Sequence, residues 1–236
     1  MTDSNLETKL EQFNEQFSEL DIEERILFLF GKWNEKEVLV TSSFGAQSAL
    51  LLHSVSRVRP NQIIHFIDTG FHFPETIEYK EKLTSLLKLQ VVDISPTPVV
   101  QQLTVQRRLW ETDPDACCFF NKIAVMNTLK ARYKIWVSGL RRHQTTNRDR
   151  LLFFGRAGGR DDIIKCYPLL DVDETQAAIY EQRFQLPPHP LLEQGFCSIG
   201  CRHCTVKGEG RKGRWAGSNK TECGLHLEHP AQPAMV

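Results

Sequence analysis

Hydrophobic residues recur every three or four positions near the start of the chain, at Leu6, Leu10, Phe13, Phe17 and Leu20. This spacing predicts an amphipathic helix with one buried face. Asp21 followed by Glu24 has the spacing of a capping box, so a second helix is expected through Ile26–Phe30. We assign residues 1–36 to an N-terminal helical segment.

Short apolar runs rich in β-branched residues follow, at Val38–Ser42, Ile63–Asp68, Gln90–Ile94, Ile135–Ser138 and Ile163–Cys166. They are nearly continuous in apolar residues, and 20 or more residues separate successive runs, as in a parallel sheet covered on both faces. Helices are expected between and after them, at Gln47–Val58, Pro74–Lys88, Val99–Trp110, Cys118–Tyr133 and Glu174–Gln185. Residues 37–190 are therefore predicted to form a doubly wound α/β domain with a mostly parallel sheet.

In such sheets ligands bind beyond the carboxyl ends of the strands. The segments in that position are TSSFGAQS, DTGFHFPET and SGLRRHQ. Beyond Pro190 the chain is rich in Gly, Cys and basic residues and has little periodicity. We expect residues 191–236 to form an extension with a mobile tip.

Composition narrows the class of protein. The chain has 236 residues, a quarter of them charged, with a formal net charge of zero, which is ordinary for a soluble globular domain. It has no apolar run long enough for a membrane span and no secretory signal pattern, so we expect a cytoplasmic protein without membrane contact. Seven cysteines in a reducing compartment indicate metal or redox chemistry rather than disulfides.

Charge is unevenly distributed along the chain. Residues 1–36 carry nine acids and four bases, whereas residues 130–165 carry ten bases and three acids. Residues 201–220 carry six bases and one acid. The two basic stretches could face a small polyanion or nucleic acid, or could simply be solvated surface.

The segment Ser42–Ser48 has small hydroxyl residues and a glycine between a strand and a helix, where free backbone N–H groups can hold an anion. It is similar to the S-G-G-x-D-S loop of ATP pyrophosphatases, with Phe44 in place of the first Gly and Gln47 in place of the Asp. These two changes argue against ATP cleavage but not against nucleotide binding.

Two cysteine pairs are candidate metal ligands. Cys201 and Cys204 form a C-x-x-C pair, and Cys117 and Cys118 are adjacent. Four thiolates suit either a tetrahedral zinc or a 4Fe–4S cluster. An adjacent pair fits zinc poorly but can span two irons, which favours the cluster; Cys166 is interpreted as a buried strand thiol.

Cys223 has the surroundings of a reactive thiol. It lies in a polar, Gly-flanked segment, KTECGLHLEHP, and basic residues precede it. Nearby cations favour the thiolate, which is the nucleophilic form.

Taken together, ECGLH at Glu222–His226, SSFGAQS, DTGFHFPET, GLRRHQ and the two cysteine pairs resemble the assimilatory sulfonucleotide reductases, which act on adenylyl sulfate (APS) or phosphoadenylyl sulfate (PAPS). The resemblance covers roughly residues 25–229 and implies an adenine nucleotide alpha hydrolase-like fold. The four cysteines are similar to those of the subgroup that carries a 4Fe–4S cluster and generally uses APS.

The resemblance implies a mechanism and roles for individual residues. Cys223 would attack the sulfur of the substrate, expel AMP and become an S-sulfocysteine, from which thioredoxin or glutaredoxin releases sulfite. Lys122 would bridge cluster and substrate, and Glu222 and His226 would belong to the catalytic motif. Substrate-binding roles fall on Ser43, Gly45, Ser48, Asp68, Gly70, Arg142, Arg148, Arg211 and Arg214.

Alternatives remain within and outside this family. PAPS instead of APS is open, because a 3′-phosphate needs only one or two additional cations. An ATP-dependent tRNA thiolase would need an intact S-G-G-x-D-S loop, and a nucleic-acid-binding metal module would not need Cys223. We expect no nucleic-acid partner, and we expect a homo-oligomer.

Overall fold

The structure, a computed structural model, describes residues 3–156 and 163–226. Within them lies a six-stranded sheet in the order β3-β2-β1-β4-β6-β5. The strands are β1 (Val38–Thr41), β2 (Ile63–Ile67), β3 (Gln90–Ile94), β4 (Ile135–Val137), β5 (Phe154–Arg156) and β6 (Ile164–Cys166). All neighbouring pairs are parallel except β5 with β6. The predicted doubly wound, mostly parallel sheet is confirmed.

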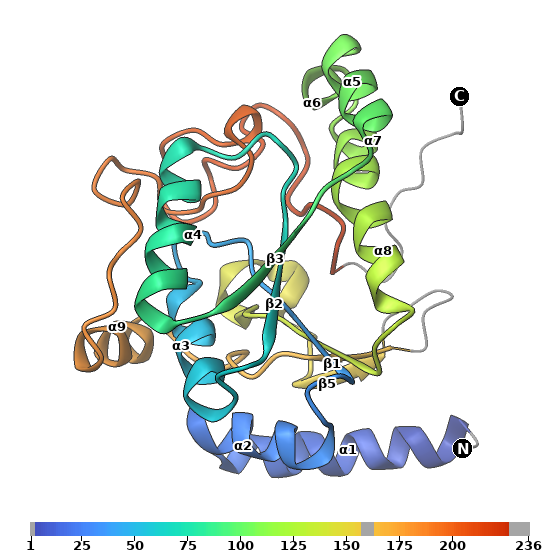
Figure 1. Cartoon of the computed structure of the whole chain (residues 1–236), viewed down its shortest axis with the longest axis vertical. Coiled ribbons are helices and arrows are strands. Elements are labelled where there is room, and N and C mark those ends of the chain that lie inside the picture. The colour runs from blue at the N-terminus through green and yellow to red at the C-terminus, as the bar shows by residue number, and fades with distance from the viewer. Residues whose placement is uncertain (1–2, 157–162, 227–236) are drawn as a thin grey trace.

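Helices cover both faces of this sheet (Figure 1). One face carries α3 (Ala49–Val58), α4 (Pro74–Leu87) and α9 (Glu174–Arg183). The other carries α5 (Pro98–Gln106), α6 (Leu109–Thr112), α7 (Pro114–Cys118) and α8 (Ala124–Lys130). This arrangement explains the apolar character of the strands, since β1 and β4 are buried on both sides.

Two predicted helices are each interrupted in the structure. The expected helix Val99–Trp110 ends at Gln106, and Arg108 adopts a left-handed conformation with φ of 48° before α6 begins. The expected helix Cys118–Tyr133 is a π-helical turn (Phe119–Ile123) inserted between α7 and α8. A period of 3.6 residues does not reveal such a turn, and π-turns occur often at functional sites.

The strand β5 was not predicted from the sequence. It has three residues, includes Gly155 and pairs only with β6 at the edge of the sheet. A strand this short leaves too few residues to display an alternating pattern.

The N-terminal helices α1 (Asp3–Glu19) and α2 (Ile22–Lys32) lie across the end of the sheet opposite the C-terminal segment (Figure 1). The predicted capping box is present, because the Asp21 carboxylate accepts from the Glu24 amide and the Glu24 side chain accepts from that of Asp21. Phe13 and Phe17 of α1 pack on Phe154, with ring centroids 5.5 and 4.5 Å apart.

Residues 191–226 form an irregular segment whose described regular element is the 3₁₀ turn Arg202–Cys204. The segment packs against the domain, with Leu191 and Trp215 only 1% and 5% exposed. Residues 227–236, where the mobile tip was expected, lie outside the described residues. The division into segments 1–36, 37–190 and 191–236 stays a prediction. Within the described ranges, no helix has the length and apolar character required to cross a membrane.

Candidate active site

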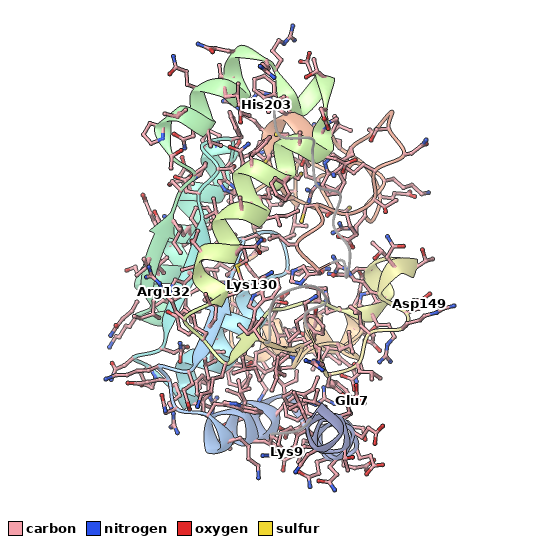
Figure 2. All side chains as sticks on the ribbon, turned by 90° about the vertical axis from the view of Figure 1, so that its right-hand side faces the viewer. Glu7, Lys9, Lys130, Arg132, Asp149 and His203 are labelled. Atoms are coloured by element: carbon pink, nitrogen blue, oxygen red, sulfur yellow. The ribbon has the colours of Figure 1, made fainter. Side chains whose placement is uncertain are left out.

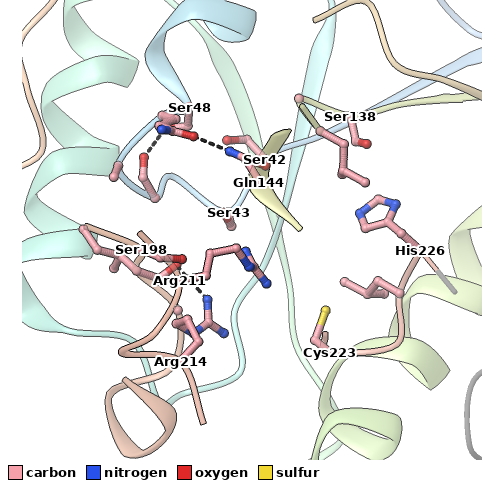
Figure 3. A pocket seen from close by; sticks show the side chains of 18 of the residues that line it. Ser42, Ser43, Ser48, Ser138, Gln144, Ser198, Arg211, Arg214, Cys223 and His226 are labelled. Carbon is pink, nitrogen blue, oxygen red and sulfur yellow. Dashed lines mark hydrogen bonds between the residues drawn. The ribbon is translucent and has the colours of Figure 1, made fainter. Parts of the chain in front are cut away.

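A cavity of about 450 Å³ opens beyond the carboxyl ends of β1, β2 and β4. The strand order reverses between β1 and β4, so this is the switch point at which doubly wound sheets bind ligands. The loop after β1, the loop after β4 and the segment 197–226 all contribute to its wall. Figure 3 shows Arg211 and Arg214 on one side of it and Cys223 and His226 on the other.

The loop Ser42–Ser48 is held in shape by its own side chains. The Ser42 hydroxyl accepts from the Phe44 amide at 3.1 Å, and the Ser48 hydroxyl donates to the Gly45 carbonyl at 2.8 Å. Phe44 is buried with φ of 47°, so it adopts the left-handed conformation that a glycine takes readily. Packing against Phe66 holds its ring in place, with centroids 5.6 Å apart. The predicted residues Ser43, Gly45 and Ser48 all line the cavity.

The Glu222 carboxylate is bound by two of the arginines predicted to hold substrate. Arg148 donates from Nε to Oε1 at 2.9 Å and from Nη2 to Oε2 at 3.2 Å. Arg211 donates to Oε2 at 3.1 Å, and the Thr145 hydroxyl donates to Oε1 at 3.0 Å. These donors surround a side chain that is 9% exposed. Together they form a cationic binding site at the cavity wall, in which the bound anionic group is the Glu222 carboxylate.

Further cationic donors face the same cavity. The Nε atoms of Arg211 and Arg214 are buried and have no hydrogen-bond partner among the described residues. Arg214 also donates to the Ile199 carbonyl at 3.3 Å, and its guanidinium lies 4.3 Å from the centre of the Trp215 ring. Because both arginines line the cavity, their remaining donors can bind a second anionic group.

The tail carrying the ECGLH motif is docked against the domain. His226 stacks on Trp136 at 4.6 Å with an interplanar angle of 16°. Burial, reinforced by the charges of Arg148 and Lys165, lowers the pKa of His226 well below its ordinary value. Cys223 is half-buried at the cavity wall.

Lys122 lies in the π-turn and joins the cysteine pairs to the cavity. Burial opposes its charge, but the neighbouring sulfurs of Cys201, Cys118 and Cys223 outweigh burial and raise its pKa above the ordinary value. The pKa of Cys201 is lowered because this ammonium and the Thr69 hydroxyl, 3.4 Å from the sulfur, together outweigh burial. Lys122, which lines the cavity, therefore lies near the cysteine pairs and near Cys223.

The four predicted ligand cysteines lie near one another. Burial raises the pKa values of Cys117, Cys118 and Cys204, and the charge of Cys201 raises each further. No three His, Cys, Asp or Glu side chains in residues 3–156 and 163–226 converge around a single ion. A set of four thiols from two segments fits the donor chemistry of an iron–sulfur cluster, whose cysteine sulfurs bind separate irons and so lie farther apart than the ligands of one ion.

Three predicted substrate-binding residues do not line the cavity. Arg142 lies at the start of the 3₁₀ turn Arg142–Gln144, and its side chain donates to the Leu151 carbonyl at 3.1 Å instead of facing the cavity. Asp68 accepts from the Gly70 amide at 2.8 Å, so this pair shapes the turn after β2. Of the four arginines predicted to bind substrate, Arg148, Arg211 and Arg214 line the cavity and Arg142 does not.

Other residues at the cavity were not singled out from the sequence, namely Trp136, Ser138 and Gln144. Ser138 and Gln144 belong to the SGLRRHQ segment after β4, which was predicted to matter as a whole. Trp136 looks like any buried strand residue in the sequence, and no local signal reveals that its ring supports His226.

Residues 37–207 match the family model described as phosphoadenosine phosphosulfate reductase domain. That match covers the sheet, the Ser42–Ser48 loop and both cysteine pairs. The chain belongs to this family. The sulfonucleotide reductase resemblance seen in the sequence is thereby confirmed, and with it the class of enzyme, an oxidoreductase.

Two relatives extend the match along most of the chain. An adenosine 5'-phosphosulfate reductase from Bacillus cereus is 35% identical over 228 residues, covering 92% of this chain and 97% of the relative. One from Lysinibacillus sphaericus is 38% identical over 200 residues, covering 80% and 84%.

Solved structures support the fold. A phosphoadenylyl-sulfate reductase from Candida auris, crystallised with phosphate, aligns with a TM-score of 0.73 at 24% identity, covering 84% of this chain and 96% of that one. The FMN adenylyltransferase of Candida glabrata in complex with FAD and pyrophosphate aligns at 0.56 with 16% identity, covering 86% and 67%. These likenesses confirm the adenine nucleotide alpha hydrolase-like architecture.

Proposed function

We propose that this protein is a thioredoxin-dependent adenylyl-sulfate reductase that converts APS to sulfite and AMP in sulfate assimilation. The observation that carries the proposal is the position of Cys223 at a cavity whose opposite side presents Arg211 and Arg214. The names of the two relatives above and the four cysteines favour APS over PAPS.

The proposed reaction has two parts. The Cys223 thiolate attacks the sulfur of APS, so a sulfur–sulfur bond forms while the bond from sulfur to the bridging phosphate oxygen breaks. AMP leaves with the electron pair of that bond, and Cys223 becomes an S-sulfocysteine. A thiolate of thioredoxin or glutaredoxin then attacks the Cys223 sulfur and expels sulfite, and the second thiol of that reductant releases Cys223. The dithiol supplies the two electrons.

The cavity residues suit this chemistry. A thiolate is repelled by a sulfate group, and the departing AMP gains charge, so the reaction needs fixed cations. Arg148, Arg211, Arg214 and Lys122 supply them, and their planar or ammonium donors suit phosphosulfate oxygens. Ser43, Gly45 and Ser48 would face the nucleotide. Glu222 and His226 would keep the tail, and hence Cys223, at the cavity.

Cys117, Cys118, Cys201 and Cys204 are proposed to hold a 4Fe–4S cluster. Such a cluster would fix the Cys117–Cys118 helix against the Cys201–Cys204 turn and tune the local field. Lys122 lies near Cys201 and Cys223, so it would transmit that field to the reacting sulfur. The thiol chemistry above balances without electrons from iron.

PAPS remains the second candidate substrate. The description of the matching family names the phosphorylated nucleotide. Arg107 and Arg108, which the sequence offers as cations for a 3′-phosphate, do not line the cavity, and Arg108 pairs with Glu111 at 2.6 Å. Seven free thiols and a dithiol reductant suit a reducing compartment, and we propose the cytoplasm. A homo-oligomeric state stays a prediction.

Sulfite release should be measured from APS and from PAPS with the purified iron-containing protein and reduced thioredoxin. We expect APS to be preferred at least tenfold in kcat/KM, equivalent to about 1.4 kcal/mol of transition-state stabilisation. The Cys223→Ser variant should form no sulfite and keep its iron–sulfur absorbance. Cys166→Ser is the matched control, because Cys166 is buried in β6 and away from the cavity.

If the protein prefers PAPS, the proposed substrate becomes PAPS and the proposed reaction stays the same. Sulfite formation by Cys223→Ser at the normal rate would contradict the mechanism itself. ATP consumption with transfer of sulfur to tRNA would place the protein in another class, although Phe44 and Gln47 already depart from the loop that such enzymes need.

A further inference from the structure

The carboxamide of Gln144 joins two segments of the cavity that are far apart in the sequence. Its Nε2 donates to Oε1 of Gln47, in the loop after β1, and its Oε1 accepts from Nη1 of Arg148. Figure 3 shows Gln144 beside the loop that carries Ser42, Ser43 and Ser48. Gln47, Gln144 and Arg148 all line the cavity.

These two contacts fix the direction of the amide. An amide presents a donor at one end and an acceptor at the other, so the oxygen that faces Arg148 requires the NH₂ group to face Gln47. The Arg141 amide, 3.4 Å from the same oxygen, favours the same orientation.

The orientation of Arg148 follows from that of Gln144. With Nη1 directed to Gln144, the remaining edge of the guanidinium, Nε and Nη2, faces Glu222 at 2.9 and 3.2 Å. Arg148 is 7% exposed, so a rotated guanidinium would leave buried donors without partners. A planar fork binds a carboxylate or a phosphosulfate only when it is turned toward it.

We propose that Gln144 is a positioning residue that orients Arg148 toward the cavity and, through Gln47, links the nucleotide-facing loop to the tail that carries Cys223. This inference rests on the proposed function for its catalytic consequence. The contacts to Glu222 make it testable without turnover as well.

The chemistry at position 47 supports this link. Where ATP pyrophosphatases have Asp, this chain has Gln47, whose neutral amide accepts from Gln144 without adding negative charge. A carboxylate there would compete for the charge of Arg148, which lies one side chain away. Gln47 therefore links the loop to Gln144 while the charge of Arg148 stays directed at Glu222.

The test is a double-mutant cycle between Gln144→Leu and Arg148→Lys. Losing a hydrogen bond to a charged group should lower kcat/KM for APS about tenfold in Gln144→Leu. If Gln144 acts through Arg148, the double variant should be within about twofold of Arg148→Lys alone. Gln47→Leu should cause a smaller loss, about threefold, because it leaves the Arg148 contact in place.

A second readout does not depend on sulfite. The rate at which iodoacetamide alkylates Cys223, followed by mass spectrometry of its peptide, reports how firmly the tail is docked. We expect Gln144→Leu and Arg148→Lys each to raise this rate several-fold, again without additivity, while the iron content stays unchanged. Gln182→Leu, at an exposed position of α9, is the matched control and should behave as the unaltered chain.

Multiplicative losses in the double variant, or unchanged alkylation in Gln144→Leu while Arg148→Lys accelerates it, would overturn the proposal. If the unaltered protein makes no sulfite from APS, the proposed function fails, and the alkylation cycle still decides the role of Gln144. Should Gln144→Leu not fold, Gln144→Asn, whose shorter side chain withdraws the amide from Arg148, replaces it in the same two measurements.

Discussion

At the scale of single residues, Lys122 has an unusual combination of neighbours. Its ammonium lies near Cys201, and the sulfurs of Cys118 and Cys223 also favour its charge. A residue that only balanced the charge of metal ligands would not need to face the nucleophile. This placement supports the proposal that Lys122 acts on the substrate rather than on the proposed cluster.

Replacing Lys122 with Met should lower the rate of sulfite formation about 100-fold, because a preorganised cation at the reacting group is lost. The iron content per chain should stay unchanged, since four thiols remain as ligands. Iron analysis and the visible absorbance spectrum check the second statement. Lys82→Met, on the exposed side of α4, is the control. Loss of iron from the Lys122 variant would make this residue structural instead.

At the scale of elements, the sequence was sufficient to predict the strands that form continuous apolar runs. The five predicted strands appear within about one residue of their bounds, because buried parallel strands are continuously apolar. It was insufficient where geometry depends on distant contacts. The π-turn that carries Lys122, the edge strand β5 and the turn that directs Arg142 away from the cavity all depend on tertiary packing.

The candidate site likewise combines local motifs, which the sequence reveals, with contacts between distant segments, which it does not. ECGLH and the cysteine pairs are local motifs, so Cys223 and the four thiols could be named from the sequence. The pairing of Glu222 with Arg148 and Arg211 could not, since it joins segments 74 and 11 residues apart. The stacking of His226 on Trp136 likewise requires the folded tail.

Arg25 of α2 binds to several neighbouring segments. Arg25 is 4% exposed and donates to both oxygens of Asp171, at 2.6 and 2.9 Å, and to the carbonyls of Phe17 and Pro168. Its guanidinium also lies 4.4 Å from the centre of the Phe153 ring. This side chain therefore joins α1, α2 and the segment after β6.

Arg25→Gln should lower the free energy of unfolding by about 3 kcal/mol, because it leaves two buried carbonyls and a carboxylate without their donor. Arg57→Gln is the matched control. Its ion pair with Glu23 spans 3.3 Å between exposed side chains, so its loss should cost at most about 1 kcal/mol. Urea unfolding of both variants measures the difference. Equal losses would show that the buried contacts of Arg25 contribute nothing beyond those of a surface pair.

At the scale of the whole molecule, charge separates toward opposite ends. The described part of the acidic N-terminal segment, residues 3–36, covers the end of the sheet away from the cavity, and Figure 2 places Glu7 and Lys9 of α1 far from His203 of the C-x-x-C turn. The cations that precede Cys223 gather at the carboxyl ends of the strands. A net charge of zero thus coexists with a strongly cationic cavity, which suits an anionic substrate.

Buried histidines make the stability of the whole fold depend on pH. His189 is fully buried, and its Nδ1 accepts from the Leu191 amide at 3.2 Å, so Nε2 carries the proton and donates to Thr76. Burial lowers the pKa of His189 to about 4. In the unfolded chain the same group binds a proton near pH 6.5. Between these values the unfolded state holds more protons, so the contribution is complete above pH 6.5 and is lost as the pH falls toward 4.

His189→Asn tests this contribution, because the Asn oxygen can still accept from Leu191 but does not titrate. At pH 7.5 the variant should be less stable than the unaltered chain, and the difference should narrow by about 2 kcal/mol as the pH falls from 6.5 to 4.5. Urea unfolding at several pH values measures it. Burial also lowers the pKa values of His65 and His72, so a residual slope of the same sign should persist in the variant. A difference that stays constant over this range would show that His189 takes up its proton equally in both states.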